Sequence, residues 1–246
     1  MTLDTGTYLS ALAADSEAFA DLATDLDAPV PSCPDWKVAD LVEHLGGVYS
    51  WVQLSVRGGG ERPTTNRDQA PGSRAELVPW FLGQRAGVLD ALTAHEPDAP
   101  AWNFTGRTET FHVGWWRRRQ AMETAIHLFD MEAALGEPKQ IAPELASDGV
   151  DELVGSFLPG SLSRKPVAGL EGTLHLHCTD VDGEWVLDFR EGTIDVRREH
   201  AKADAALRGP ASDLFLWVWN RVPLDSGSFE VFGRREIAEA FAQVCL

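Results

Sequence analysis

The side chains best suited to chemistry lie on two segments that we expect to be helical. Glu123 and His127 are four residues apart, so they point the same way from a helix and can hold one ion between them. His44 falls between Leu41 and Val48, on the core-facing side of another predicted helix. Together they would form a set of two histidines and one glutamate, a familiar catalytic zinc arrangement that leaves positions open for water or substrate.

Each of these signals also has an ordinary structural interpretation. A lone histidine on a core-facing side, such as His44, is usually a hydrogen-bonded core residue. The stripe of Gln120, Glu123, His127 and Asp130 follows a helical spacing and could be the solvated edge of an apolar face. Glu-x-x-x-His is common by chance and is not the His-Glu-x-x-His motif of metalloproteases. On these residues alone, a metal site and a structural role both stay open, and Asp130 could either orient an imidazole or be a simple solvated carboxylate.

The first part of the chain is predicted to be a helical bundle. Apolar residues recur at helical intervals in four segments separated by loops that contain proline or glycine. The predicted helices cover approximately residues 8–26, 36–56, 73–94 and 114–135. Four helices with apolar stripes and moderate loops favour a four-helix bundle, which we assign to residues 1–140.

The pattern changes after residue 140, and residues 141–246 are predicted to form a smaller α+β domain. After a helix over approximately 143–158, residues 172–179 alternate as a half-buried strand does. Asp182-Gly183 and Glu191-Gly192 predict tight turns into two further strands. Another strand at 203–208, helices at 214–219 and 237–244, and a short strand near 229–232 complete a mainly antiparallel sheet with helices.

Two further groups of residues have competing interpretations. His175 and His177 face the same side of the predicted strand and could pair as metal ligands. Because no third ligand lies near them in sequence, we favour surface or hydrogen-bonded histidines. The Arg117-Arg118-Arg119 run could bind a carboxylated substrate, although ion pairs on a solvated face are favoured. Arg74 and Arg85 are additional candidates for binding a carboxylate.

The composition limits the partners of the protein. The 246 residues include 21 Lys and Arg against 38 Asp and Glu, a formal net charge of −17 that disfavours binding to nucleic acid or to anionic membranes. The longest uncharged apolar stretch, residues 45–56, is too short to span a bilayer, and the first residues lack the pattern of a signal peptide. Cys33, Cys178 and Cys245 are odd in number and far apart, which favours free thiols in a reduced, cytoplasmic protein.

Three separated motifs resemble one protein family over nearly the whole chain. They are VPSCPDWKVADLVEHLGGV (30–48), WWRRRQAMETAIHLFDME (115–132) and ADAALRGPASDLFLWVWNR (203–221). They are similar to the mycothiol-dependent maleylpyruvate isomerases, whose fold is a DinB-like metal-binding helical bundle followed by a C-terminal domain. The zinc ligands of that family are a His, a Glu and a His, and the resemblance places them at His44, Glu123 and His127.

The resemblance also implies a chemistry. In that family a divalent metal, expected to be Zn²⁺, binds the thiol of mycothiol, a cysteinyl pseudo-disaccharide. A free thiol has a pKa of about 8.5 and is mostly protonated at neutral pH, whereas coordination to zinc deprotonates it. The implied function is therefore a metal-dependent enzyme, an isomerase or an S-transferase, that uses mycothiol on a small electrophile. The alternatives are a non-enzymatic small-molecule binding protein, whose C-terminal domain would resemble sterol-carrier folds, and a zinc hydrolase that needs no thiol.

Overall fold

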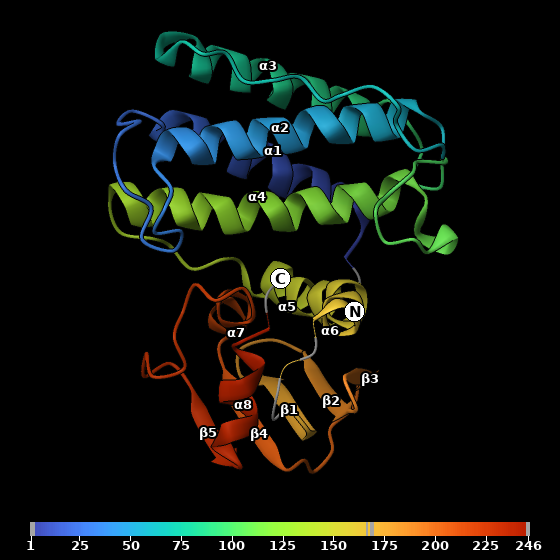
Figure 1. Ribbon diagram of the computed structural model, residues 1–246, viewed down its shortest axis with the longest axis vertical. Helices are drawn as coiled ribbons and strands as arrows, with labels where there is room; N and C mark the ends of the chain where they lie inside the picture. The colour runs from blue at the N-terminus through green and yellow to red at the C-terminus, as the bar shows by residue number, and fades with distance from the viewer. Residues whose placement is uncertain (1–2, 166, 168–169, 245–246) are drawn as a thin grey trace. The chain divides into compact units, whose positions relative to one another are not determined.

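The computed structural model describes residues 3–165, 167 and 170–244. The chain forms two compact units, one comprising Asp4–Lys139 and the other containing the residues from Gln140 onward. Figure 1 shows helices alone in the first unit and helices with a sheet in the second. The predicted fold class, an α-helical bundle followed by a smaller α+β unit, is confirmed.

The first unit is the predicted four-helix bundle. Its long helices are α1 (Thr5–Leu22), α2 (Val38–Arg57), α3 (Arg74–Thr93) and α4 (Val113–Leu135), with a short 3-10 turn at Thr108–Thr110. The most extensive packing joins α1 to α4 and α2 to α3. The first pair joins the two ends of the unit's sequence, whereas α2 and α3 follow one another along the chain (Figure 1).

Apolar stripes explain why these four segments fold against one another. On α1, Tyr8, Leu12 and Phe19 are almost completely buried, and the Asp4 side chain caps the helix by accepting hydrogen bonds from the first-turn N–H groups. Burying each such side chain contributes about 1.5–3 kcal/mol of hydrophobic stabilisation. This core fixes α2 and α4 as rigid supports for the polar residues that they carry.

The second unit contains a five-stranded sheet and several short helices. Its strands are β1 (Gly172–Cys178), β2 (Glu184–Arg190), β3 (Thr193–Arg197), β4 (Ala205–Gly209) and β5 (Glu230–Gly233), in the order β3-β2-β1-β4-β5. Its helices are α5 (Pro143–Glu152), α6 (Leu158–Arg164), α7 (Ala211–Val218) and α8 (Arg235–Phe241). Among the strand pairs of the described residues, β1–β4 alone is parallel, so the sheet is mainly antiparallel as predicted.

One predicted helix differs from the observed structure. The helix expected over approximately 143–158 is interrupted by a π-helical turn at Leu153–Phe157 and then continues as α6 to Arg164. Pro159, in the first turn of α6, has no N–H and cannot donate the backbone hydrogen bond that a continuous α-helix would need there. The π-helical turn ends at Phe157, two residues before this proline. Apolar periodicity alone does not reveal such a change in helical pitch.

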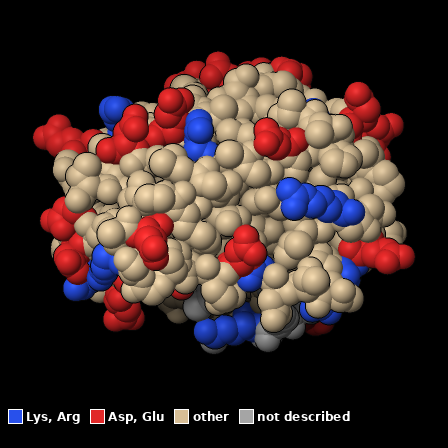
Figure 2. Space-filling model, turned by 90° about the horizontal axis from the view of Figure 1, so that it is seen from above, with Lys and Arg blue, Asp and Glu red and all other residues tan. Residues whose placement is uncertain are grey.

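The surface charge, the hydropathy of the helices and the cysteines are the remaining features that the composition addressed. On the face shown in Figure 2, acidic side chains are widely spread and most of the basic ones stand apart from one another. Within the described chain, no helix has both the length and the apolar character needed to cross a membrane. Cys33 and Cys178 are free thiols, and Cys245 lies outside the described residues.

Candidate metal centre

The structure brings His44, Glu123 and His127 together. His44 is on α2, whereas Glu123 and His127 lie one turn apart on α4. Oε1 of Glu123 is 3.3 Å from Nε2 of His44 and 3.4 Å from Nε2 of His127. One potential ligand atom from each residue lies within 4.8 Å of the other two. The two signals that were separate in the sequence therefore meet at one point between two helices.

The spacing and the chemistry of these donors fit a divalent transition metal. Zinc bonds to histidine nitrogen and carboxylate oxygen are about 2.0–2.2 Å long, so the ligand atoms of a tetrahedral site lie about 3.3–3.6 Å apart. Both distances from the Glu123 oxygen fall in this range. Two imidazoles and one carboxylate also form a common set for a catalytic site with open positions.

Neighbouring side chains orient two of the three candidate ligands. Nδ1 of His127 lies 2.9 Å from Oδ2 of Asp130, which leaves Nε2 to face Glu123. Asp130 is fully buried and also accepts a hydrogen bond from Ser32, so it is not a solvated carboxylate. Arg119 donates to Oε2 of Glu123, which leaves Oε1 directed at the two histidines. Such outer partners fix the tautomer and the orientation of metal ligands.

The same contacts set the charge of the site. Burial acts to raise the pKa of Glu123, but Arg119 and the hydrogen bonds from His127 and His44 outweigh it and hold that pKa well below its ordinary value. Burial acts to lower the pKa of His127, whereas the hydrogen bonds to Asp130 and Glu123 raise it overall. Glu123 is therefore a carboxylate at neutral pH, the state in which it can bind a cation.

The interpretation of the arginine run as a solvated face is wrong for two of its members. The side chain of Arg119 is only 4% exposed because it is held against Glu123. Arg117 is also buried, and its guanidinium donates to the backbone carbonyls of Leu92 and His95. Consecutive residues on a helix point in different directions, so a run of one residue type does not define one face.

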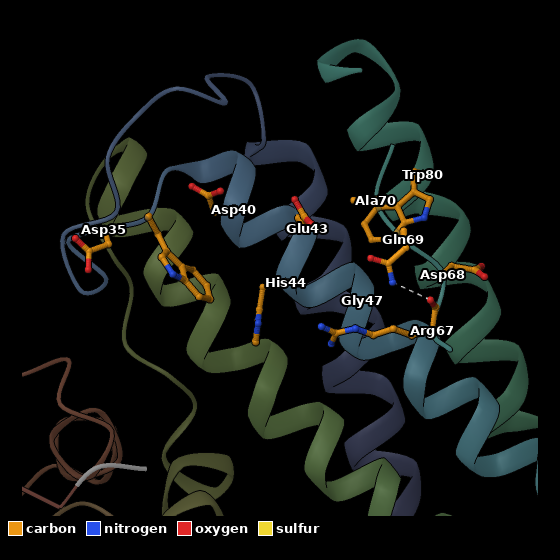
Figure 3. A pocket seen from close by; sticks show the side chains of 11 residues that line it. Asp35, Asp40, Glu43, His44, Gly47, Arg67, Asp68, Gln69, Ala70 and Trp80 are labelled. Atoms are coloured by element: carbon orange, nitrogen blue, oxygen red, sulfur yellow. Dashed lines mark hydrogen bonds between the residues drawn. The ribbon is translucent and has the colours of Figure 1, made fainter. Parts of the chain in front are cut away.

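A pocket of about 440 Å³ opens beside His44 (Figure 3). The exposed fraction of the His44 side chain is 34%, against 8% for His127, so the candidate centre is most accessible from the His44 side. The lining is mainly polar and includes acidic, amide and aromatic side chains. It consists of Asp35, Trp36, Asp40, Glu43, His44, Gly47, Arg67, Asp68, Gln69, Ala70 and Trp80.

Models of two domains match the sequence. The mycothiol maleylpyruvate isomerase N-terminal domain matches residues 9–132, and the MDMPI C-terminal domain matches residues 144–240. The chain belongs to the mycothiol maleylpyruvate isomerase family. Membership identifies the protein as an enzyme and confirms the resemblance indicated by the three sequence motifs.

Solved structures show that the fold of this family member is shared. The crystal structure of the mycothiol-dependent maleylpyruvate isomerase matches with a TM-score of 0.62 at 15% identity, covering 94% of this chain and 95% of that chain. A histidine-to-alanine mutant of that isomerase matches with a TM-score of 0.64 at 13% identity and the same coverage. No curated protein sequence matches the chain. The likeness extends over nearly the whole of both chains and shows a shared fold.

The pocket contains one basic residue that the sequence did not reveal as a site residue. Arg67 lies in the loop between α2 and α3 and extends along α2 past Gly47 (Figure 3). Its guanidinium makes no hydrogen bond or ion pair with the described residues. The two arginines proposed as carboxylate binders lie elsewhere: Arg74 pairs with Asp27, and Arg85 donates to Ser16 and to a carbonyl of α1. Arg67 stands in a long polar loop without periodicity, so no pattern marked it.

Proposed function

We propose that this chain is a cytoplasmic, metal-dependent enzyme that activates mycothiol for isomerisation of a small electrophile or for S-transfer to one. The metal would be held by His44, Glu123 and His127 in a bundle domain of residues 1–140, with residues 141–246 as the C-terminal domain. The observation that carries the proposal is the convergence of these three donor atoms beside an open pocket. A divalent cation held there would lower the pKa of a coordinated thiol and favour the nucleophilic thiolate.

The protein side chains then have separate tasks. Asp130 holds the His127 ring so that Nε2 faces the centre, and Arg119 keeps the Glu123 carboxylate charged and directed. Both partners are buried, so the donor set is arranged before any ligand arrives. Preorganisation of this kind lowers the free-energy cost of binding and of reaching the transition state.

The pocket beside His44 would accept the organic groups. Carboxylate and amide acceptors such as Asp40, Glu43 and Gln69 suit the hydroxyl groups of a sugar-containing thiol. The unpaired guanidinium of Arg67 suits a carboxylate on the electrophile, since Arg can bind carboxylate through two parallel hydrogen bonds. Isomerisation of a double bond by reversible thiolate addition, bond rotation and elimination returns the thiol unchanged, so mycothiol would act catalytically. S-transfer would instead consume it.

Metal analysis of untagged protein purified without chelator tests the proposal. We expect Glu123→Ala to lose one equivalent of metal relative to the wild type. Glu43→Ala is the matched control because Glu43 is a neighbour of His44 that lines the pocket without being one of the three donors. In a titration, mycothiol should then bind to the wild type and should not bind to Glu123→Ala.

The possible outcomes separate the alternative functions. Equal metal content in the wild type and in Glu123→Ala, or no response to mycothiol, would contradict the proposal. Hydrolysis of activated esters by metal-loaded protein without thiol would indicate a hydrolase instead. Unchanged binding of a small ligand by His44→Ala, without any turnover by the wild type, would indicate a binding protein.

A further inference from the structure

A second group of potential metal ligands lies within the C-terminal unit. His175 and His177 are two residues apart on β1 and therefore lie on the same face of the sheet. Glu184, at the start of β2, is the direct cross-strand partner of His177. His200 follows β3 and completes the group. The antiparallel pairing of β1 and β2 thus places Glu184 beside the two histidines, and His200 reaches them from the segment that follows β3.

The four side chains converge on one point. Oε2 of Glu184 lies 3.0 Å from Nε2 of His175 and 2.6 Å from Nδ1 of His200, and Oε1 lies 3.1 Å from Nδ1 of His177. Ring centroids of the three histidines are 5.3–6.2 Å apart. One potential ligand atom from each residue lies within 4.8 Å of all the others.

The surroundings favour a built site over a chance cluster. The side chain of His175 is only 8% exposed, and those of His177 and Glu184 are 22% and 27% exposed. Within the described chain, Glu184 is the only hydrogen-bonding or ion-pairing partner of the three imidazoles. Each of the three imidazoles turns a nitrogen toward the Glu184 carboxylate. The four groups therefore surround a common centre, as metal ligands do.

We propose that His175, His177, Glu184 and His200 bind a divalent transition metal, with Zn²⁺ as the expected ion. Imidazole nitrogen suits zinc, copper, nickel and iron, whereas calcium and magnesium prefer all-oxygen sites. A fourfold set of protein ligands is typical of structural zinc sites. The bound ion would tie the segment after β3 to β1 and β2.

An ion can reach this site from solvent. The His200 side chain is 78% exposed, and both His200 and Glu184 border a pocket of about 330 Å³. His175 and His177 instead lie on β1, whose strand neighbours on both sides hold it in place. The fixed pair would therefore bind first, and His200 would close over the ion.

Metal titration in a protein that lacks the other candidate centre tests this inference. Untagged full-length Glu123→Ala, freed of metal by dialysis against chelator, would be titrated with Zn²⁺ by calorimetry and with Co²⁺ by visible absorption. We expect about one equivalent to bind, with the cobalt spectrum of a tetrahedral site. Because Glu123→Ala removes a ligand of the first centre, this result is independent of the function proposed above.

Second substitutions in the same background assign the ligands. Adding Glu184→Gln preserves hydrogen bonding but replaces a carboxylate, and should weaken Zn²⁺ binding more than tenfold. Adding Glu199→Gln is the matched control, since it removes the same charge from the neighbour of His200 and should leave the affinity unchanged. His200→Ala, at the most exposed ligand, gives a second variant with little risk to folding. If Glu123→Ala binds neither Zn²⁺ nor Co²⁺, or if adding Glu184→Gln leaves the Zn²⁺ affinity unchanged, the four side chains form a hydrogen-bonded cluster and not a metal site.

Discussion

Asp130→Asn should weaken metal binding at His44, Glu123 and His127 without disturbing the fold. Asp130 is fully buried, and Oδ2 lies 2.9 Å from Nδ1 of His127. Asparagine has nearly the same shape but no charge, so it replaces a charge-assisted hydrogen bond by a weaker neutral one. Hydrogen bonds to charged groups contribute about 1.5–3 kcal/mol, and loss of the partner of a metal-binding histidine lowers affinity about 10–100-fold. The expected increase in the Zn²⁺ dissociation constant is thus about 10–100-fold, or about 1.4–2.7 kcal/mol.

Competition with a chromophoric chelator at about pH 8 provides the measurement. Asp130 also raises the pKa of His127, so protons compete with the metal more strongly in the wild type as the pH falls. Working well above the ordinary histidine pKa keeps this competition small, and the remaining difference reports the interaction with the metal. The thermal midpoint of each metal-free variant shows whether the fold is intact.

Glu132→Gln is the matched control for Asp130→Asn. Glu132 is another buried carboxylate on α4, but it accepts a hydrogen bond from the backbone N–H of Lys139 rather than contacting a candidate ligand. Zn²⁺ binding by Asp130→Asn within about twofold of the wild type would refute this role of Asp130. Equal weakening by Glu132→Gln would refute it as well, because the effect would then reflect net charge alone.

Three further predictions concern stability and substrate binding. Burial raises the pKa of Asp15 to about 6. Ionisation of Asp15 therefore lowers the free energy of unfolding progressively between about pH 4 and pH 6, with the full effect above pH 6 and none below about pH 4. Asp15→Asn should therefore increase the free energy of unfolding on the order of 1–2 kcal/mol at pH 7 and leave it unchanged at pH 3.5, as denaturant titrations at the two pH values would show. Gly149→Ala would place a methyl group 2.5 Å from the fully buried ring of Phe215 and should destabilise the protein by about 1–3 kcal/mol. Gly83→Ala, in open space on α3, should instead stabilise the protein by up to about 1 kcal/mol, and thermal unfolding distinguishes the two variants. Arg67→Met should raise KM at least about tenfold for a carboxylated electrophile with little change in kcat, and an equal KM in initial-rate measurements would exclude Arg67 from substrate binding.

The bundle was predictable because local periodicity and packing agree. Tyr8, Leu12 and Phe19 recur on one side of α1 and are buried there. Glu123 and His127 were predictable on one side of α4 for a similar reason, because the helix itself fixes their separation. Local geometry could not show that His44 faces them, because that contact depends on how α2 packs against α4.

Long-range partners explain what sequence reasoning missed around α4. Arg119 lies in a run of three arginines whose charge suggested a solvated face, yet it is buried against Glu123. A buried guanidinium is stable there only because a carboxylate compensates it, and the i,i+4 spacing from Arg119 to Glu123 provides that compensation within the helix. The spacing was visible in the sequence; the burial that gives it meaning was not.

The histidines of β1 show the same limit in a sheet. His175 and His177 had no third ligand candidate close in sequence, and hydrogen bonding was the favoured interpretation. The structure confirms that hydrogen bonding and adds Glu184 and His200. The turn at 182–183 fixes the register that places Glu184 opposite His177, so this partner follows once the hairpin is formed. His200 lies beyond β3, where no strand pairing fixes its position, and only the folded segment brings it to the cluster. A metal site assembled in this way would have two ligands set by strand periodicity, one by hairpin register and one by the segment that follows β3.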